Sequence, residues 1–174
     1  MEFKAIETRY KNCRFRSRLE SRWATFLDAV KVPWEYEKEG FSLPSGAYLP
    51  DFWIPNPMPE WPYAGYWLEI KPSNVSAADL AEAQQKMAEL TESTKHTSHI
   101  LCGTPEDCKA YFYNFYQAKW VLDNDIEYPV GHPDPVLFHL VYSLTHEVPV
   151  VPIQEAIAAA MSARFEHGES GAPK

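Results

Sequence analysis

Cysteine is scarce in this chain of 174 residues, and long apolar runs are missing from it. The three cysteines, Cys13, Cys102 and Cys108, are odd in number, and their spacing fits neither a disulfide framework nor a metal-binding cluster. No segment approaches the roughly 18 apolar residues that a membrane-spanning helix needs. The first 22 residues are charged throughout and lack the apolar stretch of a secretory signal peptide. We therefore expect a reduced, cytoplasmic protein that does not enter a membrane.

Basic residues are fewer than acidic residues overall, but they are concentrated in the N-terminal part of the chain. The formal net charge is −8, from 16 Lys and Arg against 24 Asp and Glu. Residues 1–31 nevertheless hold eight of the basic residues and four of the acidic ones. A local basic patch is enough to contact phosphates, because net charge mainly sets long-range steering and solubility. The residues that we expect to contact phosphates are Arg14, Arg16, Arg18 and Arg22, and the alternative is a solvated basic helix face.

Apolar and aromatic residues are plentiful, at 45% and 14%, as is typical of a globular protein. The length suits a single domain over residues 1–174 with a sizeable core. Apolar periodicity and the positions of prolines predict a helix, three strands, a second helix and a fourth strand. The expected ranges are 17–30, 34–37, 47–54, 66–71, 77–94 and 98–102. This order is typical of an α/β sandwich with one mixed sheet.

The remaining segments have weaker patterns. Prolines at 55, 57, 59 and 62 form a stiff connection that neither a helix nor a central strand can include. Residues 111–116 are compatible with either a strand or an aromatic-rich helix. The other expectations are a short strand or arm at 3–12, a turn at 40–46, helices at 134–146 and 152–165, and a frayed tail at 166–174.

Two of the expected strands carry one carboxylate each, and the second also carries a lysine. Asp51 follows Pro50 in one strand, and Glu69 and Lys71 close the other. Strand alternation places Glu69 and Lys71 on one face, with Ile70 on the opposite face. If the two strands pair, about 4.7–4.9 Å apart, Asp51 lies beside Glu69. We therefore expect two carboxylates and an amine to converge at one place on the sheet.

This combination suits the hydrolysis of phosphodiesters. Mg²⁺ prefers oxygen ligands and is usually held by one or two carboxylates together with waters and phosphate oxygens. Water bound to the metal loses a proton more readily, and the scissile phosphate becomes more electrophilic. A lysine on the same face orients the attacking water or neutralises charge that develops on the phosphate. The sequence therefore predicts a Mg²⁺ site, which Mn²⁺ also fits, at Asp51 and Glu69.

The order of elements, with Glu20 on the first helix and with Pro50-Asp51 and Glu69-Ile70-Lys71 on paired strands, resembles the PD-(D/E)XK nuclease superfamily. The resemblance covers residues 14–103, approximately, and this stretch is similar to uncharacterised phage and prophage proteins of that superfamily. It implies a restriction-endonuclease-like mixed sheet flanked by helices, with an α-β-β-β-α-β core. Residues from about 105 to 174 would form a C-terminal extension outside the common core.

The resemblance also implies roles for individual residues. Asp51, Glu69 and the backbone carbonyl of Ile70 would ligate Mg²⁺, and Lys71 would position water or stabilise the transition state. Glu20 would assist a metal directly or through water. The following helix carries Gln84 and Lys86 where some members have an accessory polar residue.

The function implied is that of an enzyme, a metal-dependent endonuclease or exonuclease that acts on nucleic acid and foremost on DNA. One alternative is a nuclease-like fold that binds DNA or a protein without catalysis. Another is a nuclease subunit that needs a partner protein in a phage or transposition assembly. Cleavage of both strands with one active site per chain would favour a homodimer.

Glu20 also has a structural interpretation. Ser17-x-x-Glu20 is a capping box, in which the glutamate satisfies backbone amides at the beginning of a helix. Capping and metal assistance need not exclude one another, so both roles stay open.

Overall fold

A six-stranded mixed sheet is the centre of the computed structural model, which describes residues 7–56, 65–114, 118–122, 137, 140–142, 144 and 152–165. The strand order is β10-β9-β8-β7-β6-β3, and β7 and β8 form its parallel pair. The strands are β3 (Glu35–Tyr36), β6 (Phe52–Pro55), β7 (Gly65–Lys71), β8 (Thr97–Cys102), β9 (Lys109–Asn114) and β10 (Lys119–Leu122). The predicted α/β class with a mixed sheet is confirmed.

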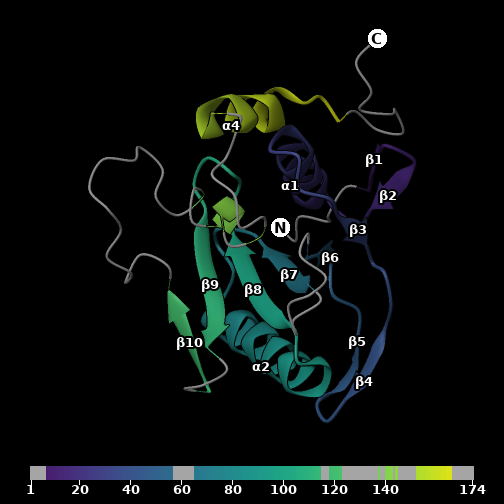
Figure 1. Ribbon diagram of the computed structural model, residues 1–174, viewed down its shortest axis with the longest axis vertical. Helices are drawn as coiled ribbons and strands as arrows, with labels where there is room; N and C mark the ends of the chain where they lie inside the picture. Colours follow the sequence, from purple (N-terminus) through teal and green to yellow (C-terminus); the bar gives the residue numbers. More distant parts are fainter. Residues whose placement is uncertain are drawn as a thin grey trace.

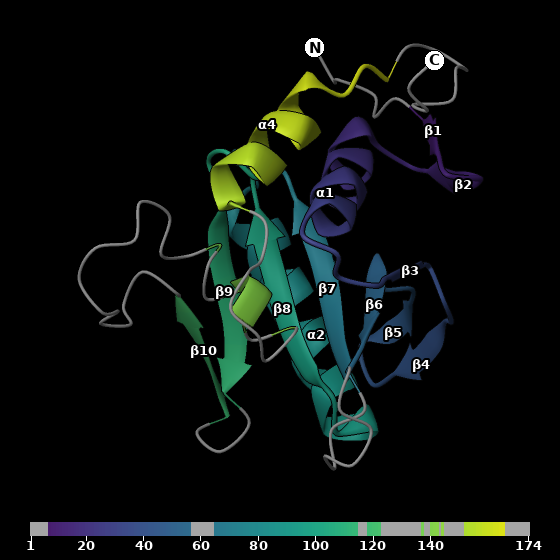
Figure 2. The same ribbon diagram turned by 45° about the horizontal axis from the view of Figure 1, so that its top comes forward.

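Helices cover both faces of this sheet (Figures 1 and 2). α1 (Arg18–Ala29) and α4 (Ile153–Ser162) pack side by side on one face, and α2 (Ala77–Thr94) lies on the other. Each layer has its own apolar core. The α1 side buries Trp23, Phe26 and Ile157, whereas the α2 side buries Met87 and Leu90. The sheet is therefore apolar on both faces, as a sheet between two helical layers must be.

Strand β7 shows the alternation that its sequence predicts. Leu68 and Ile70 belong to the core beneath α1, and Trp67 belongs to the core beneath α2. Glu69 shares the face of Trp67, because successive side chains of a strand point to opposite faces. A carboxylate is thereby placed near the end of a strand, between the apolar residues Leu68 and Ile70.

Two of the expected boundaries are wrong, and proline explains one of them. The strand expected over 47–54 is interrupted at 49–51, because Pro50 has no N–H to donate to a neighbouring strand. The turn expected at 40–46 is instead part of a hairpin of β4 (Phe41–Leu43) and β5 (Gly46–Tyr48). Gly46, with a φ of 123°, provides the backbone conformation that this tight connection needs. A further hairpin, β1 (Thr8–Tyr10) with β2 (Cys13–Phe15), precedes α1.

The C-terminal part contributes strands as well as a helix. Residues 111–114 lie in β9, so the strand alternative holds for this stretch, and α4 lies within the helix expected at 152–165. The helix expected at 134–146 lies mostly outside the described residues, as do the proline-rich stretch 57–62 and the tail 166–174. In the described part of the chain, no helix is both long and apolar enough to cross a membrane.

Gly65 marks a point where β7 comes too close to β6 for a side chain. A Cβ here would lie 2.6 Å from Cζ2 of Trp53 and would overlap the carbonyl oxygen of Ile54. We expect Gly65→Ala to lower the free energy of unfolding by about 1–3 kcal/mol, because the strand or the indole must shift. Thermal denaturation measures this effect. Gly40→Ala, where the nearest atom is 3.7 Å away, is the matched control, and equal losses in both variants would contradict the explanation.

Candidate functional site

Asp51 lies in the interruption between β5 and β6. At this point a bond from its carboxylate, and not a backbone bond, connects it to β7. Its side chain is buried, and Oδ2 accepts a 2.7 Å hydrogen bond from the backbone N–H of Ile70 in β7. Its own carbonyl oxygen accepts a 2.9 Å bond from the N–H of Glu37. Because Phe52 pairs with Leu68, the antiparallel register continues to Asp51 beside Glu69. The structure thus brings the two carboxylates to one place, as the sequence predicts.

Glu69 is buried but opens towards a cavity through its two oxygen atoms. Oε1 lies 2.7 Å from Nζ of Lys71, and Oε2 accepts a 2.6 Å hydrogen bond from the hydroxyl of Tyr48. Burial lowers the pKa of Lys71, but attraction to Glu69 and Asp51 outweighs burial, so the pKa is raised and the amine stays charged. Burial and the charge of Glu69 raise the pKa of Tyr48, which therefore remains a donor.

Glu20 occupies the first turn of α1 and performs the capping that its sequence context predicts. Ser17 is the N-cap, and its hydroxyl accepts a 3.2 Å bond from the N–H of Glu20 and donates a 2.7 Å bond to Oε1. Oε2 accepts bonds from the hydroxyl of Tyr36 at 2.5 Å and from the N–H of Arg16 at 3.1 Å. Burial and the bond to Glu20 raise the pKa of Tyr36, so this phenol also stays protonated. Helix capping and proximity to the site coexist in this residue.

Arg16 connects the carboxylates of the site to a residue that sequence reasoning missed. Its Nη2 lies 2.6 Å from Oδ1 of Asp51, and its Nε lies 2.7 Å from Oε1 of Glu37. The Arg16 side chain is 55% exposed, whereas that of Asp51 is 3% exposed, so the guanidinium closes the carboxylate off from solvent. Glu37 has a left-handed backbone with φ of 46°, which is uncommon outside glycine and is associated with functional sites.

Negative charge exceeds positive charge at this cluster. The carboxylates are Glu20, Glu37, Asp51 and Glu69, and the cations are Arg16 and Lys71. Burial raises the pKa of Asp51 well above its usual range, and repulsion from Glu69 and Glu20 adds to this rise. A further positive charge at this cluster would reduce the repulsion among its carboxylates.

The donor set fits Mg²⁺, although it is small. No group of three or more His, Cys, Asp or Glu among the described residues is arranged to hold a metal. Mg²⁺ does not need such a group, because one or two carboxylates with waters and substrate oxygens are its usual protein ligands. The guanidinium of Arg16, 2.6 Å from Asp51, is a stand-in cation at this carboxylate. Asp51 and Glu69 thus have the chemistry that a hard divalent cation requires.

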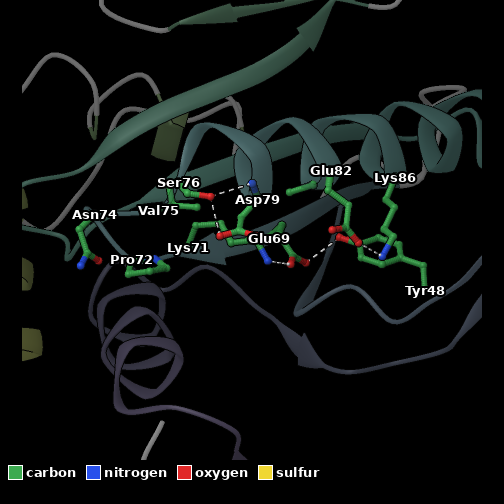
Figure 3. A pocket seen from close by; sticks show the side chains of 11 residues that line it. Tyr48, Glu69, Lys71, Pro72, Asn74, Val75, Ser76, Asp79, Glu82 and Lys86 are labelled. Carbon is green, nitrogen blue, oxygen red and sulfur yellow. Dashed lines mark hydrogen bonds and ion pairs between the residues drawn. The ribbon is translucent and has the colours of Figure 1, made fainter. Parts of the chain in front are cut away.

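A cavity of about 470 Å³ opens beside Glu69 and Lys71, and α2 forms its opposite wall (Figure 3). Lys86 lines this wall, where it pairs with Glu82 at 2.6 Å and approaches the ring of Tyr48. Gln84, the other expected accessory residue, is not among the residues that line the cavity; its carbonyl accepts a bond from Trp120. The cavity is thus bordered by the carboxylate of Glu69 and the amine of Lys71, the two groups that phosphodiester chemistry would use.

The four arginines expected to contact phosphates do not form one surface. Arg14 lies on the β1–β2 hairpin and pairs with Glu7, and Arg16 pairs with the carboxylate cluster. Arg22 donates to backbone carbonyls of α4, and Arg18 and Arg22 line a second cavity together with residues 161–165. The basic segment of the sequence is therefore divided among three places.

Replacement of Glu20 separates its capping role from its charge. We expect Glu20→Ala to lower the free energy of unfolding by about 1–3 kcal/mol, because the hydroxyls of Ser17 and Tyr36 lose their acceptor. Glu20→Gln keeps an acceptor oxygen and should lose much less. Thermal denaturation of both variants in EDTA measures this, and equal losses would show that the charge, not the hydrogen bonding, stabilises the helix.

Comparisons with protein-family models and with curated proteins do not assign a function to this chain. No protein-family model matches the chain, and no curated protein matches it either. The function is therefore inferred from the geometry of Asp51, Glu69 and Lys71.

Proposed function

We propose that this protein is a Mg²⁺-dependent nuclease that hydrolyses phosphodiester bonds of DNA. The observation that carries the proposal is that Glu69 and Lys71 border a cavity, with the buried carboxylate of Asp51 beside Glu69. Two buried carboxylates are costly unless they are paired or bind a cation. A purely structural role would not require both of them beside an amine that opens to solvent.

The residues have separate tasks in this proposal. Asp51 and Glu69, with the carbonyl of Ile70, hold the metal, and Glu20 assists from α1. The metal, when bound, supplies an acidified water and charge neutralisation at the phosphate. Lys71, anchored by Glu69, orients the attacking water or balances charge on the phosphate. Tyr48 fixes the second oxygen of Glu69, so this carboxylate is presented in one orientation.

The proposal extends to fold family, location and partners. We assign the chain to the PD-(D/E)XK superfamily with its restriction-endonuclease-like core at residues 14–103 and an extension from 105. Apart from the hairpin of β4 and β5 between β3 and β6, the described elements α1, β3, β6, β7, α2 and β8 have the order of that core, which supports the assignment. The three free cysteines support a reducing, cytoplasmic setting. A homodimer, or a partner protein of a phage or mobile element, is part of the same proposal.

Incubation with nucleic acid tests this function directly. Linear duplex, single-stranded and branched DNA are treated with purified protein in Mg²⁺, in Mn²⁺ and in EDTA, with RNA as a further substrate. We expect cleavage of DNA that needs the metal and that Glu69→Gln loses. Glu106→Gln, at an exposed turn, is the control and should retain cleavage. Cleavage that persists in EDTA or in Glu69→Gln would contradict the assignment.

The second candidate is a nuclease-like fold that binds DNA or protein without catalysis. The observation in its favour is that Asp51 and Glu69 already have cationic partners, Arg16 and Lys71. This candidate predicts that neither Mg²⁺ nor Mn²⁺ raises the melting temperature, whereas a ligand that binds the folded state must raise it. A subunit that needs a partner would instead show the metal-dependent rise without cleavage.

A further inference from the structure

The second cavity lies between α1 and the end of α4 and is lined by arginines from distant parts of the sequence. It has a volume of about 640 Å³. On one side it is bordered by Arg18 and Arg22 of α1, and on the other by residues 161–165, which include the end of α4 and the residues that follow it. Arg164 is the third arginine of this wall. In Figure 2 the two helices lie side by side on the same face of the sheet.

The charge of this cavity is not compensated by the residues around it. None of the described residues that line it is acidic, and none of its three arginines forms an ion pair within the described part of the chain. Nε of Arg18 is buried and has no hydrogen-bond acceptor among the described residues. A buried donor without an acceptor is costly, so this atom indicates a missing ligand oxygen. With no acidic side chain among the described residues that line it, a wall of three guanidinium groups favours an anion, although the net charge of the protein is −8.

One arginine of the cavity is fixed and the other two are available. Nη1 of Arg22 donates to the carbonyl oxygens of Met161 at 2.9 Å and Ala160 at 3.4 Å, and so caps the C-terminus of α4. Within the part of the chain that the structure describes, Arg18 and Arg164 make no such bonds, and Arg164 is exposed. Arg22 therefore holds the two helices in place, whereas Arg18 and Arg164 can bind a ligand.

From this geometry we infer that the cavity binds a phosphate group of the nucleic-acid backbone, an inference that rests on the proposed nuclease function. Guanidinium groups match phosphate oxygens through parallel hydrogen bonds. The cavity also lies near the carboxylate cluster, because Arg18 and Glu20 occupy the same turn of α1 on opposite sides of the helix. A helix is about 10–12 Å across, a distance over which duplex DNA carries about six phosphate charges. One bound duplex could therefore reach both places.

Salt-dependent DNA binding tests the inference without catalysis. The probe is fluorescently labelled duplex DNA, titrated in EDTA over a series of KCl concentrations. We expect Arg18→Gln/Arg164→Gln to weaken binding by at least about tenfold and to reduce the slope of log K against log salt by about 1.8, as two lost phosphate contacts require. Lys109→Gln/Lys119→Gln removes the same charge from β9 and β10 and should leave the slope unchanged. Arg22 is left intact, because its loss would also uncap α4.

Three results would overturn the inference. The first is a double arginine variant that binds DNA with the wild-type slope; if the wild type still cleaves DNA with Mg²⁺, the nuclease proposal stands without this site. The second is a wild type that does not bind duplex DNA in EDTA at low salt. The third is that inorganic phosphate raises the melting temperature of the wild type but not of the double arginine variant, while both proteins bind DNA equally well. This result would assign the cavity to free phosphate.

Discussion

Replacement of Lys71 by methionine is expected to lower the rate of DNA cleavage by about 10²–10³-fold, the usual loss when one charged group that stabilises a transition state is removed. The amine lies 2.7 Å from Glu69, and its raised pKa keeps it charged through the neutral range. Methionine preserves much of the side-chain volume but supplies neither a charge nor a donor. The loss should therefore fall on kcat more than on KM.

Binding of the metal should survive this substitution. Glu69 keeps its hydrogen bond from Tyr48 and loses a competing cation, so the rise in melting temperature with Mg²⁺ should be at least as large as in the wild type. Lys119→Met, on an exposed strand, is the control for the removal of a lysine. Single-turnover cleavage and thermal denaturation provide the two readouts. Cleavage within a few-fold of wild type would remove Lys71 from the chemistry, whatever the metal does.

The part of the site that sequence reasoning predicted depends on local rules. The period of two in β7 separates Glu69 and Lys71 from Leu68 and Ile70, and prolines limit where strands run. The helix expected at 77–94 has the bounds of α2, because its apolar spacing is regular and it follows a break in the chain. Ser17 and Glu20 form their capping interaction within four residues. Each of these features is determined by neighbours in the sequence.

The partners of the carboxylates were missed because they come from distant segments. Arg16 reaches Asp51 across 35 positions, and Tyr48 reaches Glu69 across 21. An arginine in a basic segment and a tyrosine at the end of a short strand have no pattern that assigns them to a buried acid. Arg16 was expected to contact phosphate, but its guanidinium instead lies on the acid that is proposed to bind metal. One signal was available for Asp51, since Pro50 interrupts the strand and thereby frees the next side chain.

Replacement of Asp51 by asparagine is expected to abolish the metal-dependent stabilisation of the protein. A ligand that binds the folded state at about 100 times its Kd stabilises it by about 2.7 kcal/mol, which corresponds to a rise in Tm of about 5–10 °C for a chain of this size. An amide is a neutral and weak ligand for Mg²⁺, so the variant should show little of this rise. Its amide oxygen can still accept the N–H of Ile70, and the fold is therefore kept.

The same substitution removes the pH dependence that Asp51 gives to the metal-free protein. Burial, together with repulsion from Glu69 and Glu20, raises the pKa of Asp51 above the value of about 3.9 that an unfolded chain has. The folded state thus binds this proton more tightly than the unfolded state. The stabilisation is complete below the unfolded pKa and is lost as the pH rises through the folded pKa. Without metal, the wild type should therefore lose stability with rising pH over a range in which Asp51→Asn does not.

A divalent cation changes this dependence in the wild type alone, because metal and proton compete for the same carboxylate. The gain in Tm from Mg²⁺ should grow as the pH rises, while Asp51→Asn shows no gain at any pH and Glu106→Gln behaves like the wild type. Thermal denaturation across this pH range, in EDTA and in Mg²⁺, measures all three proteins. Equal metal-dependent gains in wild type and Asp51→Asn would mean that the ion binds elsewhere. Metal-free stability curves of the same shape would mean that Asp51 is paired well enough by Arg16 to stay ionised, and the site would then have no need of a metal.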